Sequence, residues 1–196
     1  MPIYKGYCKN CNQKFEVFVR SFHDRPEKIY CPECQNPGEK SKILIVSGYH
    51  PNETFALRVG EDFCQKNSNP NVQAVEYTGK PDRKTSTYNL RQFIENFDPV
   101  ISPIILHDDD ELEFDAAIVY CAKSKMERKR ALRPLLDFAS KYQGLIATGR
   151  FLTCNIKCTL IDLELNPKMG LEKARELLES FSEYLIDLYL TKGIKL

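Results

Sequence analysis

Residues 42–53 read KILIVSGYHPNE, an apolar run followed at once by a histidine and, three residues later, by a glutamate. The apolar run is short and rich in β-branched residues, which predicts a buried strand. The residues that follow, 51–66, have the periodicity of a helix. We therefore expect a strand-to-helix connection at a sheet edge, with His50 and Glu53 on one side of a first helical turn, where both reach one metal ion.

The rest of the chain continues this alternation. Further strands are expected at 72–77, 101–106, 114–121 and 156–165, and helices at 89–97, 125–142 and 170–190. Such alternation predicts an α/β fold, with a mixed or mostly parallel sheet and helices on both faces. In such folds, functional sites form outside the strand ends.

Residues 1–40 form a separate predicted unit. It contains two Cys-x-x-Cys pairs separated by 19 residues, namely Cys8, Cys11, Cys31 and Cys34. Four thiolates at this spacing form a closed tetrahedral zinc site, which indicates structural zinc; iron in a rubredoxin-like site is the alternative. The segments MPIYKGYCKNC, FEVFV and CPEC resemble the FmdB-type zinc ribbons. A turn-rich stretch at 36–41 marks the boundary, so we expect a zinc ribbon at 1–40 and a hydrolase-like domain at 41–196.

A second metal site is predicted in the α/β domain. His107 ends the apolar run VISPIIL, and Glu164 lies within CTLIDLELN. Two histidines and one carboxylate are a recurrent ligand set of catalytic zinc, and His50, Glu53 and His107 supply it. Glu164 is then the expected general base, taking a proton from the attacking water and passing it to a leaving nitrogen.

These pieces resemble the zinc carboxypeptidase superfamily, especially its succinylglutamate desuccinylase and aspartoacylase branch. The similarity rests on HPNET after a strand, a histidine at a later strand end, and DLEL before a helix. The resemblance implies that His50, Glu53 and His107 bind one zinc ion and that Glu164 is the general base. That branch usually has HGNE; Pro51 replaces its glycine, and proline suits a first helical position.

The resemblance also implies an asparagine and an arginine that hold a substrate carboxylate. Asn89-Leu90-Arg91 is the nearest counterpart. Arg91 is therefore the expected carboxylate-binding residue, because a planar guanidinium binds a carboxylate through two hydrogen bonds. Arg150 is the alternative.

The overall composition favours no particular class of binding partner. The chain of 196 residues is 42% hydrophobic, with a net charge of +1. No stretch approaches the roughly 20 apolar residues of a membrane span, and we expect a cytoplasmic protein with no membrane partner. The most basic segment, 123–133, is expected to be a solvated helix surface, with nucleic-acid binding as its alternative.

Taken together, the sequence predicts a hydrolase with one catalytic and one structural zinc ion. It would cleave a peptide or N-acyl amide bond near a carboxylate, in a peptide or a small molecule. The alternative is a non-catalytic adaptor, in which the ribbon binds protein or nucleic acid and the α/β domain keeps a degenerate site.

Overall fold

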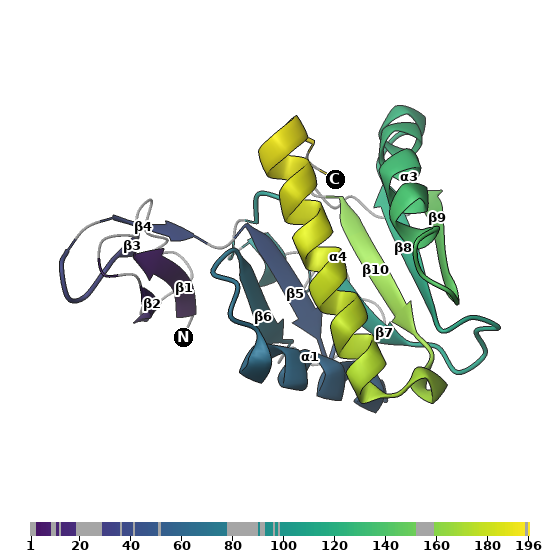
Figure 1. Ribbon diagram of the computed structural model, residues 1–196, viewed down its shortest axis with the longest axis horizontal. Helices are drawn as coiled ribbons and strands as arrows, with labels where there is room; N and C mark the ends of the chain where they lie inside the picture. Colours follow the sequence, from purple (N-terminus) through teal and green to yellow (C-terminus); the bar gives the residue numbers. More distant parts are fainter. Residues whose placement is uncertain are drawn as a thin grey trace.

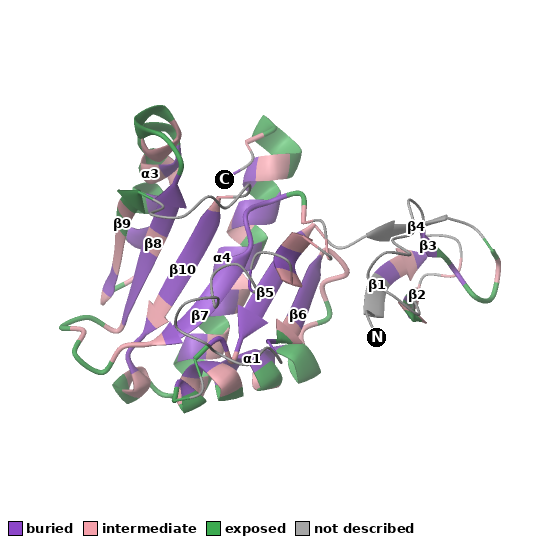
Figure 2. Ribbon diagram, turned by 180° about the vertical axis from the view of Figure 1, so that it is seen from behind, coloured by how far each residue is buried: buried purple, intermediate pink, exposed green. Residues whose placement is uncertain are grey.

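The computed structural model describes residues 3–8, 11, 13–18, 29–35, 37–40, 42–50, 52–77, 90, 93–95, 97, 99–151, 159–194 and 196. These residues form two sheets, one of four strands near the N-terminus and one of six strands. The small sheet lies beyond the β6 edge of the large one in both views (Figures 1 and 2). The described part of the chain therefore has the predicted order of a ribbon followed by an α/β unit.

The small sheet is antiparallel and has the order β2-β1-β4-β3. Its strands are β1 (Ile3–Cys8), β2 (Gln13–Phe18), β3 (Ile29–Tyr30) and β4 (Pro37–Lys40). Cys8, Phe15, Ile29 and Cys31 form its small buried cluster. A Cβ on Gly6 would lie 2.5 Å from Cδ1 of Ile29 and 2.8 Å from Cζ of Phe15, so a larger residue there would require these side chains to move.

The large sheet is mixed and mostly parallel, as the sequence predicts. Its strands, in sheet order, are β6 (Val72–Glu76), β5 (Ile43–Ser47), β7 (Ile104–Asp108), β10 (Leu160–Leu165), β8 (Ala116–Ala122) and β9 (Leu145–Phe151). The first four are parallel to one another, β8 is antiparallel to β10, and β9 is parallel to β8. The carboxyl ends of β5, β7 and β10 therefore meet at one edge of the sheet.

Three helices cover one face of this sheet. They are α1 (Thr54–Lys66), α3 (Lys125–Ala139) and α4 (Leu171–Lys192), with a short 3-10 helix η1 (Pro167–Met169) before α4. Figure 1 shows α4 lying across the strands, and its Phe181 packs in the same core as Phe63 of α1 and Phe138 of α3. Among the described residues, no helix is long and apolar enough to cross a membrane.

The opposite face has its own, smaller core. Leu44 and Val46 of β5 and Ile105 of β7 pack there against Leu90 and Ile94. Residues 90, 93–95 and 97 are helical, which confirms the prediction of helices on both faces. Since side chains alternate along a strand, this second face also receives His107, two residues after Ile105, and Glu164, which pairs with it in register.

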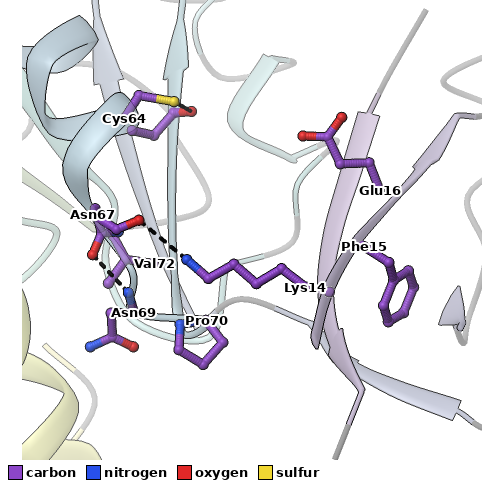
Figure 3. Close-up of a pocket in the computed structure, with 10 residues that line it drawn as sticks. Lys14, Phe15, Glu16, Cys64, Asn67, Asn69, Pro70 and Val72 are labelled. Atoms are coloured by element: carbon purple, nitrogen blue, oxygen red, sulfur yellow. Dashed lines mark hydrogen bonds between the residues drawn. The ribbon is translucent and has the colours of Figure 1, made fainter. Parts of the chain in front are cut away.

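The ribbon and the α/β unit meet at a pocket of about 360 Å³. Figure 3 shows Lys14 of β2 reaching across it, with Nζ 3.2 Å from the carbonyl oxygen of Asn67. Val72, the first residue of β6, lines the same pocket, which therefore lies toward the amino end of that strand. Neither His50 nor Glu53 lines it, so this pocket is separate from the predicted metal site.

Candidate metal centre and active site

Three strand ends bring the predicted metal ligands together. His50 and Glu53 follow β5, and His107 is the penultimate residue of β7. One ligand atom from each of these three side chains lies within 4.8 Å of the other two. Since β5, β7 and β10 run parallel, Glu164 of β10 comes directly beside His107 in the sheet register. The predicted quartet is therefore assembled at one sheet edge.

The local geometry of His50 and Glu53 differs from the predicted one. Helix α1 begins at Thr54, so the two residues lie in the turn before the helix and not within its first turn. The amide of Glu53 donates to the carbonyl of His50 at 3.1 Å, and the amide of His50 donates to Oε2 of Glu53 at 3.3 Å. These two hydrogen bonds close a turn between His50 and Glu53, and the two side chains lie close enough to share one metal ion. Pro51 lies outside the described residues.

Asp108 explains how α1 begins without a cap of its own. Glu53 occupies the N-cap position and its side chain accepts no capping bond. Instead, the carboxylate of Asp108 accepts hydrogen bonds from the amides of Phe55 at 2.9 Å and Ala56 at 2.5 Å. Asp108 therefore caps α1 from a strand of the sheet, because a helix N-terminus has free amides that attract a carboxylate. This contact ties α1 to β7, and so Glu53 to His107.

His107 lies between two carboxylates. Its Nδ1 is 3.0 Å from Oε1 of Glu53, and its Nε2 is 3.5 Å from Oδ1 of Asp162. Burial lowers the pKa of His107, but the interactions with Asp162 and Glu53 outweigh burial and raise it to about 10. The two carboxylates thus favour the protonated form of the ring.

Glu164 has the properties of a general base. Its side chain is half-buried, and burial raises its pKa above the ordinary value, although the nearby charges of His107 and Arg150 act in the opposite direction. A base works best when its pKa is close to the operating pH, which requires such a rise for a glutamate. The predicted role therefore matches the environment of this residue.

A second set of ligand atoms shares His107. One atom each of His107, Asp162 and Glu164 also lie within 4.8 Å of one another. Zinc favours the first set, because that set offers two imidazoles and a carboxylate, while Asp162 already pairs with Arg150. If the first set binds the metal, Asp162 lies outside the ligand set and faces Nε2 of His107, the ring nitrogen that does not face Glu53. A carboxylate in this position orients metal-binding histidines in many proteins.

Arg150 extends this cluster to the protein surface. Its Nη2 contacts Oδ2 of Asp162, and its Nε donates to Sγ of Cys121 at 3.1 Å. The Cys121 thiol donates to the same Oδ2 at 3.1 Å, and burial together with Asp162 raises its pKa to about 12, so it stays a thiol. The Arg150 side chain is 59% exposed. Arg91, the predicted carboxylate-binding residue, lies outside the described residues.

Asp162 is the functional candidate that sequence reasoning missed. It is 3% exposed and contacts the predicted metal ligand His107 as well as Arg150. The signal was present in LIDLEL, because an aspartate in the middle of an apolar strand is seldom buried without a partner. Its position two residues before Glu164 puts both carboxylates on the same face of β10.

Aromatic rings form one wall of the site. The ring of Tyr49 lies 4.4 Å from that of His50 and 5.9 Å from that of His107, measured between centroids. Tyr77 packs edge-on against Tyr49 at 5.8 Å. Tyr49 therefore packs against both imidazoles and lines one side of the site.

The ribbon cysteines form a separate cluster. The sulfur atoms of Cys8, Cys11, Cys31 and Cys34 all lie within 4.8 Å of one another, with Cys8 and Cys34 only 3.4 Å apart. The amides of Cys34 and Glu33 lower the pKa of Cys31, which favours the thiolate that zinc requires. Four sulfurs around one point match a closed structural zinc site.

We compared the chain with protein families, curated proteins and solved structures. Residues 1–41 match a family of zinc ribbon domains. A search of curated proteins finds no match. Among solved structures, an N-acetylmuramoyl-L-alanine amidase from Clostridium difficile 630 aligns with a TM-score of 0.50 and 12% identity, over 78% of this chain and 99% of that chain.

Two further solved structures align with lower scores. A protein assigned by name to the metallopeptidases, from Shewanella amazonensis SB2B, has a TM-score of 0.48 and 12% identity, over 76% of this chain and 77% of that chain. An N-acetylmuramoyl-L-alanine amidase of Nostoc punctiforme has a TM-score of 0.46 and 10% identity, over 76% and 96%. At such identity the likeness to the C. difficile amidase shows a shared fold and no more.

Proposed function

We propose that this protein is a zinc-dependent hydrolase that cleaves a peptide or N-acyl amide bond near a carboxylate. The observation that carries the proposal is the convergence of His50, Glu53 and His107 within 4.8 Å, with Glu164 in register beside His107. The order of these residues in the chain also supports the resemblance to the succinylglutamate desuccinylase and aspartoacylase branch. The shared fold with an amidase is consistent with it.

The residues fit a zinc ion in both charge and donor type. His50, Glu53 and His107 would hold it, at the place where Nδ1 of His107 now lies 3.0 Å from Oε1 of Glu53. When bound, zinc lowers the pKa of a water molecule and polarises a substrate carbonyl. Cys8, Cys11, Cys31 and Cys34 would hold a second, structural zinc ion.

The proton steps fall to Glu164. As a carboxylate, it takes a proton from the attacking water, and it then gives this proton to the leaving nitrogen of the amide. The raised pKa of Glu164 makes both transfers easier, because the group accepts and releases a proton nearer to neutral pH. Asp162 would hold His107 in place throughout, since it contacts Nε2 while Nδ1 faces Glu53.

A guanidinium beside the site would bind the substrate carboxylate. Among the described residues, Arg150 fits this role, because it contacts Asp162 inside the site while most of its side chain faces solvent. Its planar group can bind a second carboxylate while one edge stays on Asp162. Arg91 stays a prediction for the same role.

The substrate class follows from these groups. N-acyl amino acids and the carboxyl-terminal ends of peptides have a free carboxylate close to an amide bond. The amidase neighbour is named for an N-acyl-L-alanine bond, which belongs to the same chemical class. The division of the chain at residues 40 and 41, a macromolecular partner for the ribbon and a cytoplasmic location stay predictions.

A hydrolysis assay with matched substrates and variants tests the proposal. We expect the zinc-loaded protein to hydrolyse N-acyl amino acids with a free carboxylate and to act poorly on the same compounds with that carboxylate converted to an amide. Glu164→Gln should lower kcat by about 100-fold or more, as for loss of a general base. Glu111→Gln, a change at an exposed glutamate nearby, should leave kcat unchanged. Full activity in Glu164→Gln, or no hydrolysis of either substrate class, contradicts the proposal.

A further inference from the structure

The exposed side of α3 carries a dense positive charge. Residues 123–133 hold six basic side chains and one carboxylate, a net charge of +5 in a chain whose total is +1. Five of the six are exposed, namely Lys123, Lys125, Lys129, Arg130 and Arg133. We call these five residues the basic face of α3. The helix buries its other side through Ala131, Leu135, Phe138 and Ala139.

The basic face is not compensated within the described part of the chain. None of its five side chains takes part in an ion pair with another described residue. The pairs Lys125–Lys129 and Lys129–Arg133 are four residues apart, where like charges repel each other on a helix. Lys125 also lies in the first turn, where the helix dipole disfavours a positive charge. Bound anions would relieve this repulsion.

An exposed aromatic ring lies beside Arg128 of the same helix. Phe151, at the end of the edge strand β9, is 46% exposed, and Cζ of Arg128 lies 4.5 Å from its ring centroid. Gly149 makes this stacking feasible, since a Cβ there would lie 2.8 Å from Cγ of Arg128. Exposed aromatic rings and arginine planes are the surfaces on which unpaired bases stack. This favours a nucleic acid with exposed bases over an acidic protein or a lipid surface.

We propose that the basic face of α3, together with Arg128 and Phe151, binds single-stranded nucleic acid. Lys125, Lys129 and Arg133 follow one another at about 6 Å along the helix axis. These three positive groups therefore form a row that a negatively charged phosphate backbone can follow. Phe151, next to Arg128 of the same helix, stacks with a base of this strand. The site is independent of the proposed hydrolase centre, and neither needs the other.

Binding of a labelled single-stranded RNA of mixed sequence, about 20 nucleotides long, tests the proposal by fluorescence anisotropy as a function of salt. The double variant Lys129→Glu/Arg133→Glu should weaken binding at least tenfold and lower the slope of log K against log salt by about 1.4, for two lost phosphate contacts. The matched control is Arg58→Glu/Lys168→Glu, which makes the same charge change at two exposed residues of α1 and η1. It should keep the slope of the wild type.

Phe151→Ala tests the stacking contact separately. It should weaken binding to single-stranded RNA several-fold and leave binding to a duplex of the same length unchanged. Unaltered circular dichroism and zinc content establish that each variant is folded. No binding at low salt, equal losses in the two double variants, or stronger binding to vesicles rich in anionic lipid than to RNA would each overturn the proposal.

Discussion

Asp162 and His107 lie on neighbouring strands, with Oδ1 of the aspartate 3.5 Å from Nε2 of the histidine. This contact is on the side of the ring opposite Glu53, which is 3.0 Å from Nδ1. Asp162 is therefore placed to fix the orientation of the ring while Nδ1 stays directed at the cluster of metal ligands. A buried carboxylate in this position also makes the imidazole a stronger ligand.

The first prediction concerns this contact. Asp162→Asn should lower the zinc affinity of the second site by about 10- to 100-fold, because the ring loses its anionic partner. Titration against a zinc-chelating dye, with the ribbon already loaded, measures the affinity. Asp187→Asn, at an exposed position of α4, is the matched control and should have no effect. Unchanged affinity in Asp162→Asn would show that the aspartate does not act through His107.

The second prediction concerns pH in the metal-free protein. The pKa of His107 is raised from 6.5 to about 10, so its charge stabilises the folded state fully below pH 6.5. This contribution is lost as the pH rises toward about 10, and it is on the order of a few kcal/mol. To measure this contribution, the free energy of unfolding in urea is determined at pH 6, 8 and 10 for the chelator-treated wild type and for chelator-treated His107→Gln. The contribution is the difference between the two proteins at each pH. Both proteins contain the same ribbon cysteines, so the effect of these thiols cancels in the difference. A difference that does not vary with pH would be inconsistent with a charged His107 ring.

The third prediction concerns the cap that β7 gives to α1. Asp108→Ala removes the acceptor for the amides of Phe55 and Ala56, and should lower the free energy of unfolding by about 1 kcal/mol. It should also weaken zinc binding at the second site, because Glu53 lies at the N-cap of the same helix. Asp110→Ala, an exposed neighbour, should change neither quantity. Equal stability of the two variants would refute the capping role.

The apolar runs predicted β5, β6, β7, β8 and β10 of the large sheet, whereas β9 (Leu145–Phe151) was not among the predicted strands. The same runs placed His50, His107 and Glu164 on or directly after β5, β7 and β10. His50 follows such a run, His107 ends one, and Glu164 lies near the carboxyl end of a third, and parallel strands bring such ends to one edge. Asp162 and Asp108 were not predicted, because their partners depend on which strand neighbours β10 and on where α1 begins in space. Those relationships arise from tertiary packing, which no local pattern encodes.

The fourth prediction concerns the ribbon. Cys31→Ser should remove one zinc ion per chain and unfold the small sheet, since Cys31 is completely buried among the few apolar residues of that unit. The zinc at the second site should remain. Zinc analysis with limited proteolysis measures both effects, and Cys64→Ser, at an exposed cysteine of α1, is the control. Loss of both zinc ions in Cys31→Ser would show that the two sites depend on each other.

The most direct test of the metal centre is an anomalous difference map of the zinc-loaded protein, recorded at the zinc absorption edge. The account predicts two peaks per chain, one among the four ribbon cysteines. The other should lie about 2.0–2.2 Å from a ligand atom of each of His50, Glu53 and His107. A single peak at the ribbon, with none at the sheet edge, would contradict the account.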